Sequence, residues 1–115
     1  MFDKKTEWKI NEAVSLELAN ACNTYGASYH SLHEAYAVLL EEVEEAESDL
    51  KIMREYLGSM WDEVKTNDDE SAKADAIIMA RYAIELAKEA VQIAAVAKKI
   101  FGERPYESRT ETETK

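Results

Sequence analysis

The sequence predicts an all-α fold, namely an antiparallel helical bundle of three to four helices with one long central helix. Only three glycines and one proline interrupt its 115 residues, so few positions favour turns. Apolar residues recur at intervals of three and four, the spacing of helices, and strand-like alternation is absent. We therefore expect a single domain over residues 1–102. Residues 103–115 contain the proline and almost no apolar side chains, which predicts a disordered C-terminal tail.

The first helix is expected from about Asp3 to Tyr25, ending before Gly26. Its apolar face is predicted to consist of Ile10, Val14, Leu18, Ala21 and Tyr25. Cys22 is the single cysteine, so no disulfide forms within the chain, and its apolar neighbours favour a small buried side chain over a catalytic thiol.

The second helix is expected to begin with a capping box, in which Ser31 and Glu34 bind each other's backbone N–H groups. Its predicted core stripe, called the seam, is Leu32, Tyr36, Leu39, Val43, Ala46, Leu50, Met53, Leu57, Met60 and Val64. A continuous helix of this length would span roughly 50 Å at ~1.5 Å per residue, more than a compact domain needs. It either bends near Gly58 or packs its far end on another subunit.

The third helix is expected over about 69–101, preceded by a second capping box of Asn67 and Glu70. Its predicted seam is Ile77, Ala80, Ile84, Ala87, Val91, Ala94 and Phe101. Lys98 also falls at a seam position and is the exception to its apolar character. A flanking stripe repeats alanine every seven residues, at Ala76, Ala83, Ala90 and Ala97. Small side chains in two stripes would let another helix approach closely.

Composition excludes several classes of function. Acidic residues outnumber basic ones 24 to 14, for a net charge of −10, and no basic run offers a nucleic-acid footprint. No apolar stretch approaches ~20 residues and the N-terminus has no signal-peptide pattern, so we expect a cytoplasmic protein that does not bind a membrane. Phosphate-binding loops, GxSxG elbows and paired-cysteine motifs are absent, which argues against P-loop and covalent nucleophilic chemistry.

An acidic stripe marks the second helix. The segment LLEEVEEAES, residues 39–48, holds five glutamates and no basic residue. Glu42, Glu45 and Asp49 share one side of the helix, with Glu41 adjacent. Like charges three and four positions apart repel, whereas solvated helix faces usually mix signs. The stripe is therefore either a solvated face or a set of carboxylates that binds a cation.

A sparser polar stripe, Glu85, Glu89 and Gln92, is expected on one side of the third helix. If the second and third helices pack antiparallel, the two stripes would face each other. Converging oxygen ligands of this kind bind hard divalent cations such as Mg²⁺ or Mn²⁺.

Residues 41–45, EEVEE, resemble the EExxE motif of the all-α nucleoside triphosphate pyrophosphohydrolases, the MazG-like superfamily that also contains dimeric dUTPases. The surrounding SLHEAYAVLLEEVEEAESDL and ELAKEAVQIAAVAKKI look like a small branch of that superfamily common in phages and prophages, and the likeness covers roughly residues 30 to 101. In the family, EExxE on one helix and ExxD on a later helix hold Mg²⁺.

The resemblance implies metal ligands at Glu41, Glu42, Glu45 and Glu89, with Gln92 at the position of the family's aspartate. The gap between the two motifs is also longer than the family's usual spacing. These departures imply a weaker site, one metal instead of two, a substitute ligand such as Glu85 or Asp49, or lost activity.

The function that the resemblance implies is Mg²⁺-dependent cleavage of a nucleoside triphosphate to a monophosphate and pyrophosphate. Glu42 or Glu45 is the candidate catalytic base. The alternative is a non-catalytic helical interaction protein that keeps the scaffold. Under either hypothesis we expect a homodimer or homotetramer.

Overall fold

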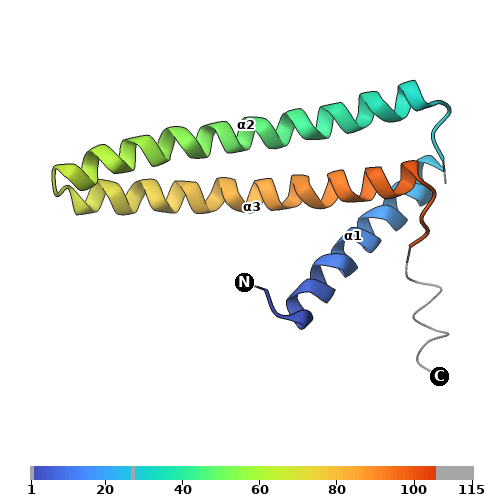
Figure 1. The fold of residues 1–115 in the computed structure, drawn as a ribbon, viewed down its shortest axis with the longest axis horizontal. Helices are drawn as coiled ribbons and strands as arrows, with labels where there is room; N and C mark the ends of the chain where they lie inside the picture. Colours follow the sequence, from blue (N-terminus) through green and yellow to red (C-terminus); the bar gives the residue numbers. More distant parts are fainter. Residues whose placement is uncertain (1, 27, 106–115) are drawn as a thin grey trace. The chain divides into compact units, whose positions relative to one another are not determined.

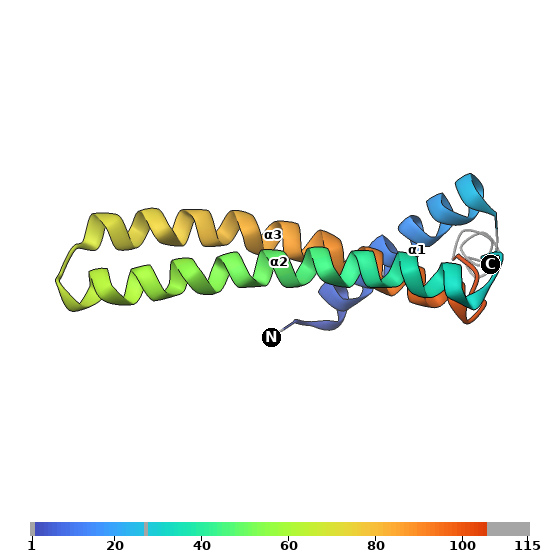
Figure 2. The same cartoon turned by 90° about the horizontal axis from the view of Figure 1, so that it is seen from above.

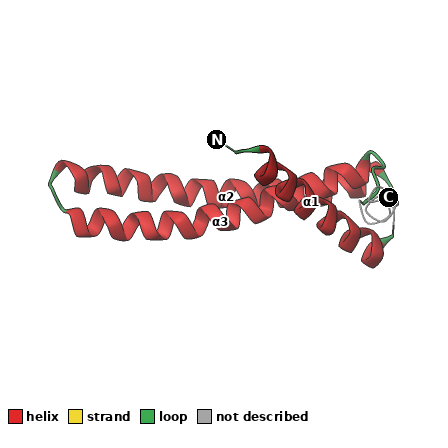
Figure 3. Cartoon of the chain, turned by 90° about the horizontal axis from the view of Figure 1, so that it is seen from below, coloured by secondary structure: helices red, strands yellow, loops and turns green. Residues whose placement is uncertain are grey.

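The computed structural model describes residues 2–26 and 28–105, and in these residues it contains three helices and no strand. They are α1 (Lys4–Tyr25), α2 (Leu32–Lys65) and α3 (Asp69–Ile100), shown in Figure 1 and, coloured by secondary structure, in Figure 3. The all-α prediction, with a long central helix, is confirmed. Of the predicted tail, residues 103–105 are irregular and 106–115 lie outside the described residues.

Helix α2 runs without interruption for 34 residues, passing through Gly58. A Cβ atom at Gly58 would meet nothing within 4 Å, so this glycine faces open space rather than a close neighbour. The intrinsic cost of one glycine, about 1 kcal/mol relative to alanine, does not end a helix of this length.

Side chains cap α1 and α2 close to the predicted positions. The Asp3 carboxylate accepts a hydrogen bond from the Thr6 N–H at 2.8 Å, and α1 ends at Gly26, whose φ is 91°. The Ser31 hydroxyl accepts from the Glu34 N–H at 3.1 Å, as a capping box requires. The return bond differs from the prediction, since Glu34 accepts from the His30 N–H, one residue before Ser31, at 3.0 Å.

The predicted cap of α3 is wrong by one residue. Asp68, rather than Asn67, caps the helix, because its carboxylate accepts from the Ser71 N–H at 3.2 Å. Asn67 instead has a φ of 61° in the turn that joins α2 to α3. Asparagine tolerates this left-handed conformation better than most residues, so Asn67 serves the turn and the next residue caps the helix.

The chain divides into two compact units, one within residues 1–42 and 91–115 and the other formed by residues 43–90. The first unit has an apolar core in which Val14 and Leu18 of α1 pack against Ala95 of α3. Cys22 is half-buried against this cluster, together with Val91 and Ala94, as expected of a small apolar side chain.

In the second unit α2 and α3 run antiparallel and are joined by a turn over 66–68 (Figures 1 and 2). The predicted seam of α2 is only half correct here. Ala46, Met53 and Met60 are half-buried, whereas the other stripe of the seam, Leu50, Leu57 and Val64, is exposed. Asp49, Tyr56 and Glu63 are half-buried in place of that stripe.

On helix α3 of this unit the covered residues again differ from the predicted seam. Ile77, Ala80, Ile84 and Ala87, all predicted to be core, are exposed. The half-buried positions include Asp75, Ile78, Met79, Tyr82, Leu86 and Glu89. Two packed helices cover only the narrow strip along which they touch. Here this strip includes polar residues, and half of the apolar seam is left outside it.

None of the helices in the described part of the chain is long and apolar enough to cross a membrane.

Candidate functional site

Two acids that are distant in sequence meet in the second unit. Glu45 on α2 and Glu89 on α3 each place a carboxylate oxygen within 4.8 Å of the other, and both belong to a carboxylate cluster that could hold a metal ion. The antiparallel course of the two helices puts these positions opposite one another. The expectation that the acidic stripes face each other thus holds for this pair.

A groove of about 310 Å³ surrounds the pair and is lined by Glu45, Ser48, Asp49, Glu85 and Glu89. Asp49 lies one turn after Glu45 on α2, and Glu85 lies one turn before Glu89 on α3. These two acids are the substitute ligands that the sequence suggested. The Glu85 carboxylate also pairs with the Lys88 ammonium at 3.4 Å, and both side chains are exposed.

A shielded oxygen atom of Glu89 indicates whether these residues fit a cation. Its Oε2 atom is shielded from solvent and accepts no hydrogen bond from any described residue. Burying a carboxylate oxygen without a partner is costly, because the oxygen loses its hydration and gains nothing in return. A divalent cation would supply the missing partner, and carboxylate oxygens are the ligands that Mg²⁺ and Mn²⁺ prefer.

The remaining predicted ligands occupy different surroundings. Glu42 lies one turn before Glu45 on the uninterrupted α2, so the two carboxylates share a side of that helix. Glu41 is exposed on α2. Gln92 is half-buried and, with Glu42 and Lys99, lines a hollow of about 590 Å³ in the first unit.

Lys99, near the end of α3, is only 2% exposed. Its ammonium lies 4.2 Å from the centre of the Tyr29 ring, a cation–π contact. Burial, followed by the charges of Cys22, Glu34 and Glu42, raises the pKa of the Tyr29 hydroxyl. Lys99 follows Ala95 by four positions, and this helical spacing from a core residue was the only sign of burial in the sequence.

A second acidic pair, which the sequence analysis missed, lies near the turn between α2 and α3. Glu63 Oε1 and Asp75 Oδ2 are both shielded from solvent. The hydrogen bond with Asp75, then burial and the charges of Asp75, Asp68 and Asp62, raises the pKa of Glu63 to about 7. Near neutral pH Glu63 is therefore partly protonated.

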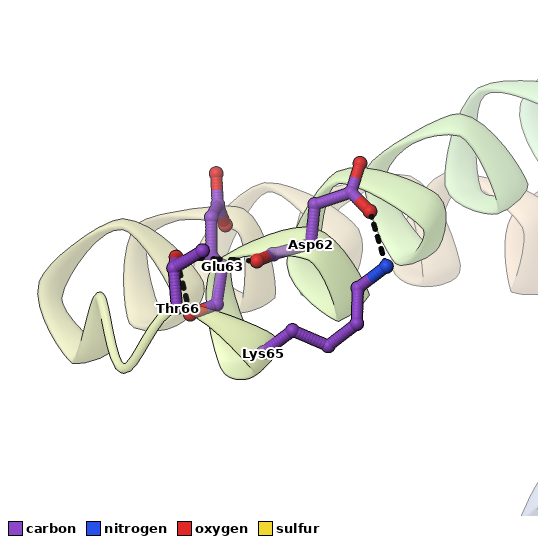
Figure 4. Close-up of polar contacts among 4 residues, drawn as sticks. All are labelled: Asp62, Glu63, Lys65 and Thr66. Atoms are coloured by element: carbon purple, nitrogen blue, oxygen red, sulfur yellow. Dashed lines mark hydrogen bonds and ion pairs between the residues drawn. The ribbon is translucent and has the colours of Figure 1, made fainter.

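Figure 4 shows the surroundings of Glu63 on α2. The Asp62 carboxylate pairs with the Lys65 ammonium at 3.2 Å, and the Glu63 side chain extends away from that lysine. The Thr66 hydroxyl donates to the backbone carbonyls of Asp62 and Glu63, each at 3.2 Å. The nearby basic side chain pairs with Asp62 and not with Glu63, so no ion pair offsets the causes that raise the pKa of Glu63.

Comparison with known proteins finds no match to this chain among family models, curated proteins or solved structures. The resemblance to the MazG-like superfamily consequently rests on the two motifs and the sequence segments around them. What the structure adds to those motifs is the approach of Glu45 to Glu89 and the buried oxygen of Glu89.

Proposed function

We propose that this protein is a Mg²⁺-dependent nucleotide pyrophosphohydrolase of the MazG-like, phage and prophage type, and that Glu45 and Glu89 hold the ion. It converts a nucleoside triphosphate to a monophosphate and pyrophosphate. The observation that carries the proposal is the convergence of the Glu45 and Glu89 carboxylates from two different helices. A merely solvated acidic face has no need of that convergence, because mutual repulsion would separate the charges.

Two further observations support the proposal. The buried Oε2 of Glu89 needs a partner that the described side chains do not supply. Asp49 and Glu85 line the same groove, so an aspartate at position 92 is not required to complete an oxygen-rich ligand set. Mn²⁺ suits these ligands as well as Mg²⁺ does.

In the proposed reaction a water oxygen forms a bond to the α-phosphorus while the bond from that phosphorus to the α–β bridging oxygen breaks. Pyrophosphate leaves with the electron pair of the broken bond. Glu42 or Glu45 accepts the proton of the attacking water, since a carboxylate near the phosphate can act as a general base. The bound cation supplies positive charge that offsets the phosphates and polarises the water.

The test is a pyrophosphate-release assay with ribo-, deoxy- and modified nucleoside triphosphates in the presence of Mg²⁺ or Mn²⁺. We expect Glu89→Gln and Glu45→Gln to lower kcat/KM by about 100-fold or more, as loss of a catalytic metal contact does. The matched control is Glu47→Gln, since Glu47 is an exposed glutamate of the same helix. Circular dichroism establishes that each variant is folded.

The control variant should retain full activity. Hydrolysis that survives in folded Glu89→Gln protein would contradict the proposed ligand set. Failure of the unmodified protein to release pyrophosphate from any of the nucleotides would contradict the proposed reaction.

The alternative is a non-catalytic helical interaction protein. The observation that favours it is the row of exposed apolar side chains at heptad spacing on the second unit, because such surfaces bind other helices. Divalent cation binding measured by calorimetry without any nucleotide turnover would support this alternative.

A further inference from the structure

The hollow of about 590 Å³ in the first unit has the size and the lining of a small-molecule site. Sites of this kind commonly measure ~300–1,000 Å³ and combine apolar walls with a few polar groups. Alanine and valine side chains form the apolar part of this hollow, and each of the three helices contributes charged or polar side chains to it. The charges in the lining indicate which class of ligand it would take.

Negative charge predominates in the lining of the hollow. Its acids are Glu17, Glu34 and Glu42. Lys99 is the only lysine or arginine among the lining residues, so the net charge of the lining is −2 when His30 is neutral. A concave surface of one charge sign attracts ligands of the opposite sign, and low-dielectric walls strengthen that attraction. The hollow therefore favours a cationic ligand.

The burial of Lys99 shows that the hollow already accommodates one ammonium group. Lysine is almost never fully buried unless its charge is compensated, yet Lys99 is only 2% exposed. Its ammonium lies 4.2 Å from the centre of the Tyr29 ring. The pKa of the hydroxyl on that ring is raised first by burial and then by nearby negative charges, those of Cys22, Glu34 and Glu42. These surroundings stabilise positive charge.

Glu17 leaves part of the negative charge without a partner. Its side chain is half-buried, but within the described part of the chain it forms no hydrogen bond and no ion pair. The same is true of the Gln92 amide, which is half-buried and lines the same hollow from α3. Polar groups that lose hydration without gaining a partner are unfavourable. A ligand that donates hydrogen bonds would satisfy both side chains.

The positions of the acids argue against a single metal ion in the hollow. Among the described residues, the groups of three or more acids that are close enough to share one ion include neither Glu17 nor Glu34. Carboxylates that do not converge on one point suit a ligand with positive charges at separate places. The side chains of Ala21, Val38 and Val96 belong to the same lining and suit a hydrocarbon segment between those charges.

We propose that the hollow binds an aliphatic polyamine, a linear chain of methylene groups that carries ammonium groups at its ends. One ammonium group pairs with the Glu17 carboxylate, the other pairs with Glu34 or Glu42, and the methylene groups cover the apolar lining. A ligand with two positive charges matches the net charge of the lining. This binding goes beyond the proposed hydrolysis and requires neither a divalent cation nor a nucleotide.

Isothermal titration calorimetry with putrescine, a linear diamine, tests the proposal in the presence of a chelator of divalent cations. The unmodified protein should bind putrescine, and Glu17→Gln should raise the dissociation constant by about tenfold or more, because a charge-assisted hydrogen bond is lost. The matched control is Glu12→Gln, since Glu12 is an exposed glutamate of α1 that does not line the hollow. This control should keep the dissociation constant of the unmodified protein. Butanediol, a neutral diol of the same length, should not bind.

A second measurement locates the ligand in the unmodified protein and so does not depend on the folding of any variant. Nuclear Overhauser effects from the methylene protons of putrescine should reach the methyl groups of Val38 and Val96, which line the hollow. They should not reach Val64, which is 47% exposed in the second unit.

Equal losses of affinity in Glu17→Gln and Glu12→Gln would indicate a general attraction to an acidic protein and would overturn the proposal. The proposal would equally be overturned by a complete lack of putrescine binding, by butanediol that binds as tightly as putrescine, or by Overhauser effects that reach Val64 alone. Because the chelator removes divalent cations and no nucleotide is present, none of these outcomes bears on the proposed hydrolysis.

Discussion

Glu63 shows how much a single residue depends on the side chains around it. In the sequence it is one of many glutamates of a charged helix. In the folded chain Asp75 faces it from α3, Asp68 and Asp62 add negative charge, and its pKa rises from 4.5 to about 7. A proton on Glu63 removes its repulsion with Asp75, so this pair favours the folded state only while Glu63 is protonated.

The stability of the protein should therefore depend on pH through Glu63. Between pH 4.5 and about pH 7 the folded state binds more protons than the unfolded state, so the free energy of unfolding falls as pH rises and levels off above pH 7. Glu63→Gln carries a neutral hydrogen-bonding group at every pH. We expect the free energy of unfolding of this variant not to fall through Glu63 over this pH range. At pH 8 the variant should have a higher Tm than the unmodified protein.

Thermal unfolding followed by circular dichroism from pH 4.5 to pH 8.5 measures this effect. Glu55→Gln, which changes an exposed glutamate of the same helix, should give a profile parallel to that of the unmodified protein. A Glu63→Gln profile parallel to both would show that the pKa of Glu63 is not raised in the folded protein.

At the scale of the element, variants at the start of α3 can distinguish the predicted cap, Asn67, from the observed cap, Asp68. Asp68→Ala should lower the free energy of unfolding by about 1 kcal/mol, because the Ser71 N–H loses its acceptor. Asp68→Asn removes the same charge but keeps a capping oxygen, so it should be close to the unmodified protein. Urea denaturation measures both.

The turn before that cap provides the complementary comparison. Asn67→Gly should preserve the stability, because glycine adopts the φ of 61° without strain. Asn67→Ala should cost about 1 kcal/mol, because a Cβ atom disfavours this conformation. If Asn67→Gly destabilised the protein as much as Asp68→Ala, Asn67 would have a capping role after all.

At the scale of the whole molecule, the net charge of −10 has to be separated from specific cation binding. NaCl should raise the Tm of every variant, because ions screen the repulsion among the acids. MgCl₂ at the same ionic strength should stabilise the unmodified protein further, by about 1.4 kcal/mol when the ion is in tenfold excess over its Kd.

Glu89→Gln should abolish that additional stabilisation and Glu47→Gln should keep it. Differential scanning calorimetry in the two salts measures the difference. Equal effects of MgCl₂ and NaCl on the unmodified protein would mean that the carboxylates are only screened, and the metal site would be excluded.

The sequence alone determined the helices. The scarcity of glycine and proline, the spacing of apolar residues at intervals of three and four, and the capping box at Ser31 all act within a few residues of the chain. Local pattern was therefore enough to predict all three helices. The helical pattern also identified Glu45 and Glu89 as candidate site residues, because helix periodicity sets which side of a helix each acid occupies.

Only the tertiary structure decided which side of each helix is covered. The apolar seam predicted for 43–90 is partly exposed, while Glu63, Asp75 and Glu89 are half-buried. Periodicity establishes that residues share a face, but a rotation of each helix about its own axis decides what that face meets, and this rotation is set by the neighbouring helix. The buried Lys99, the raised pKa of Glu63 and the shielded oxygen of Glu89 all follow from contacts between distant residues, which no local pattern encodes.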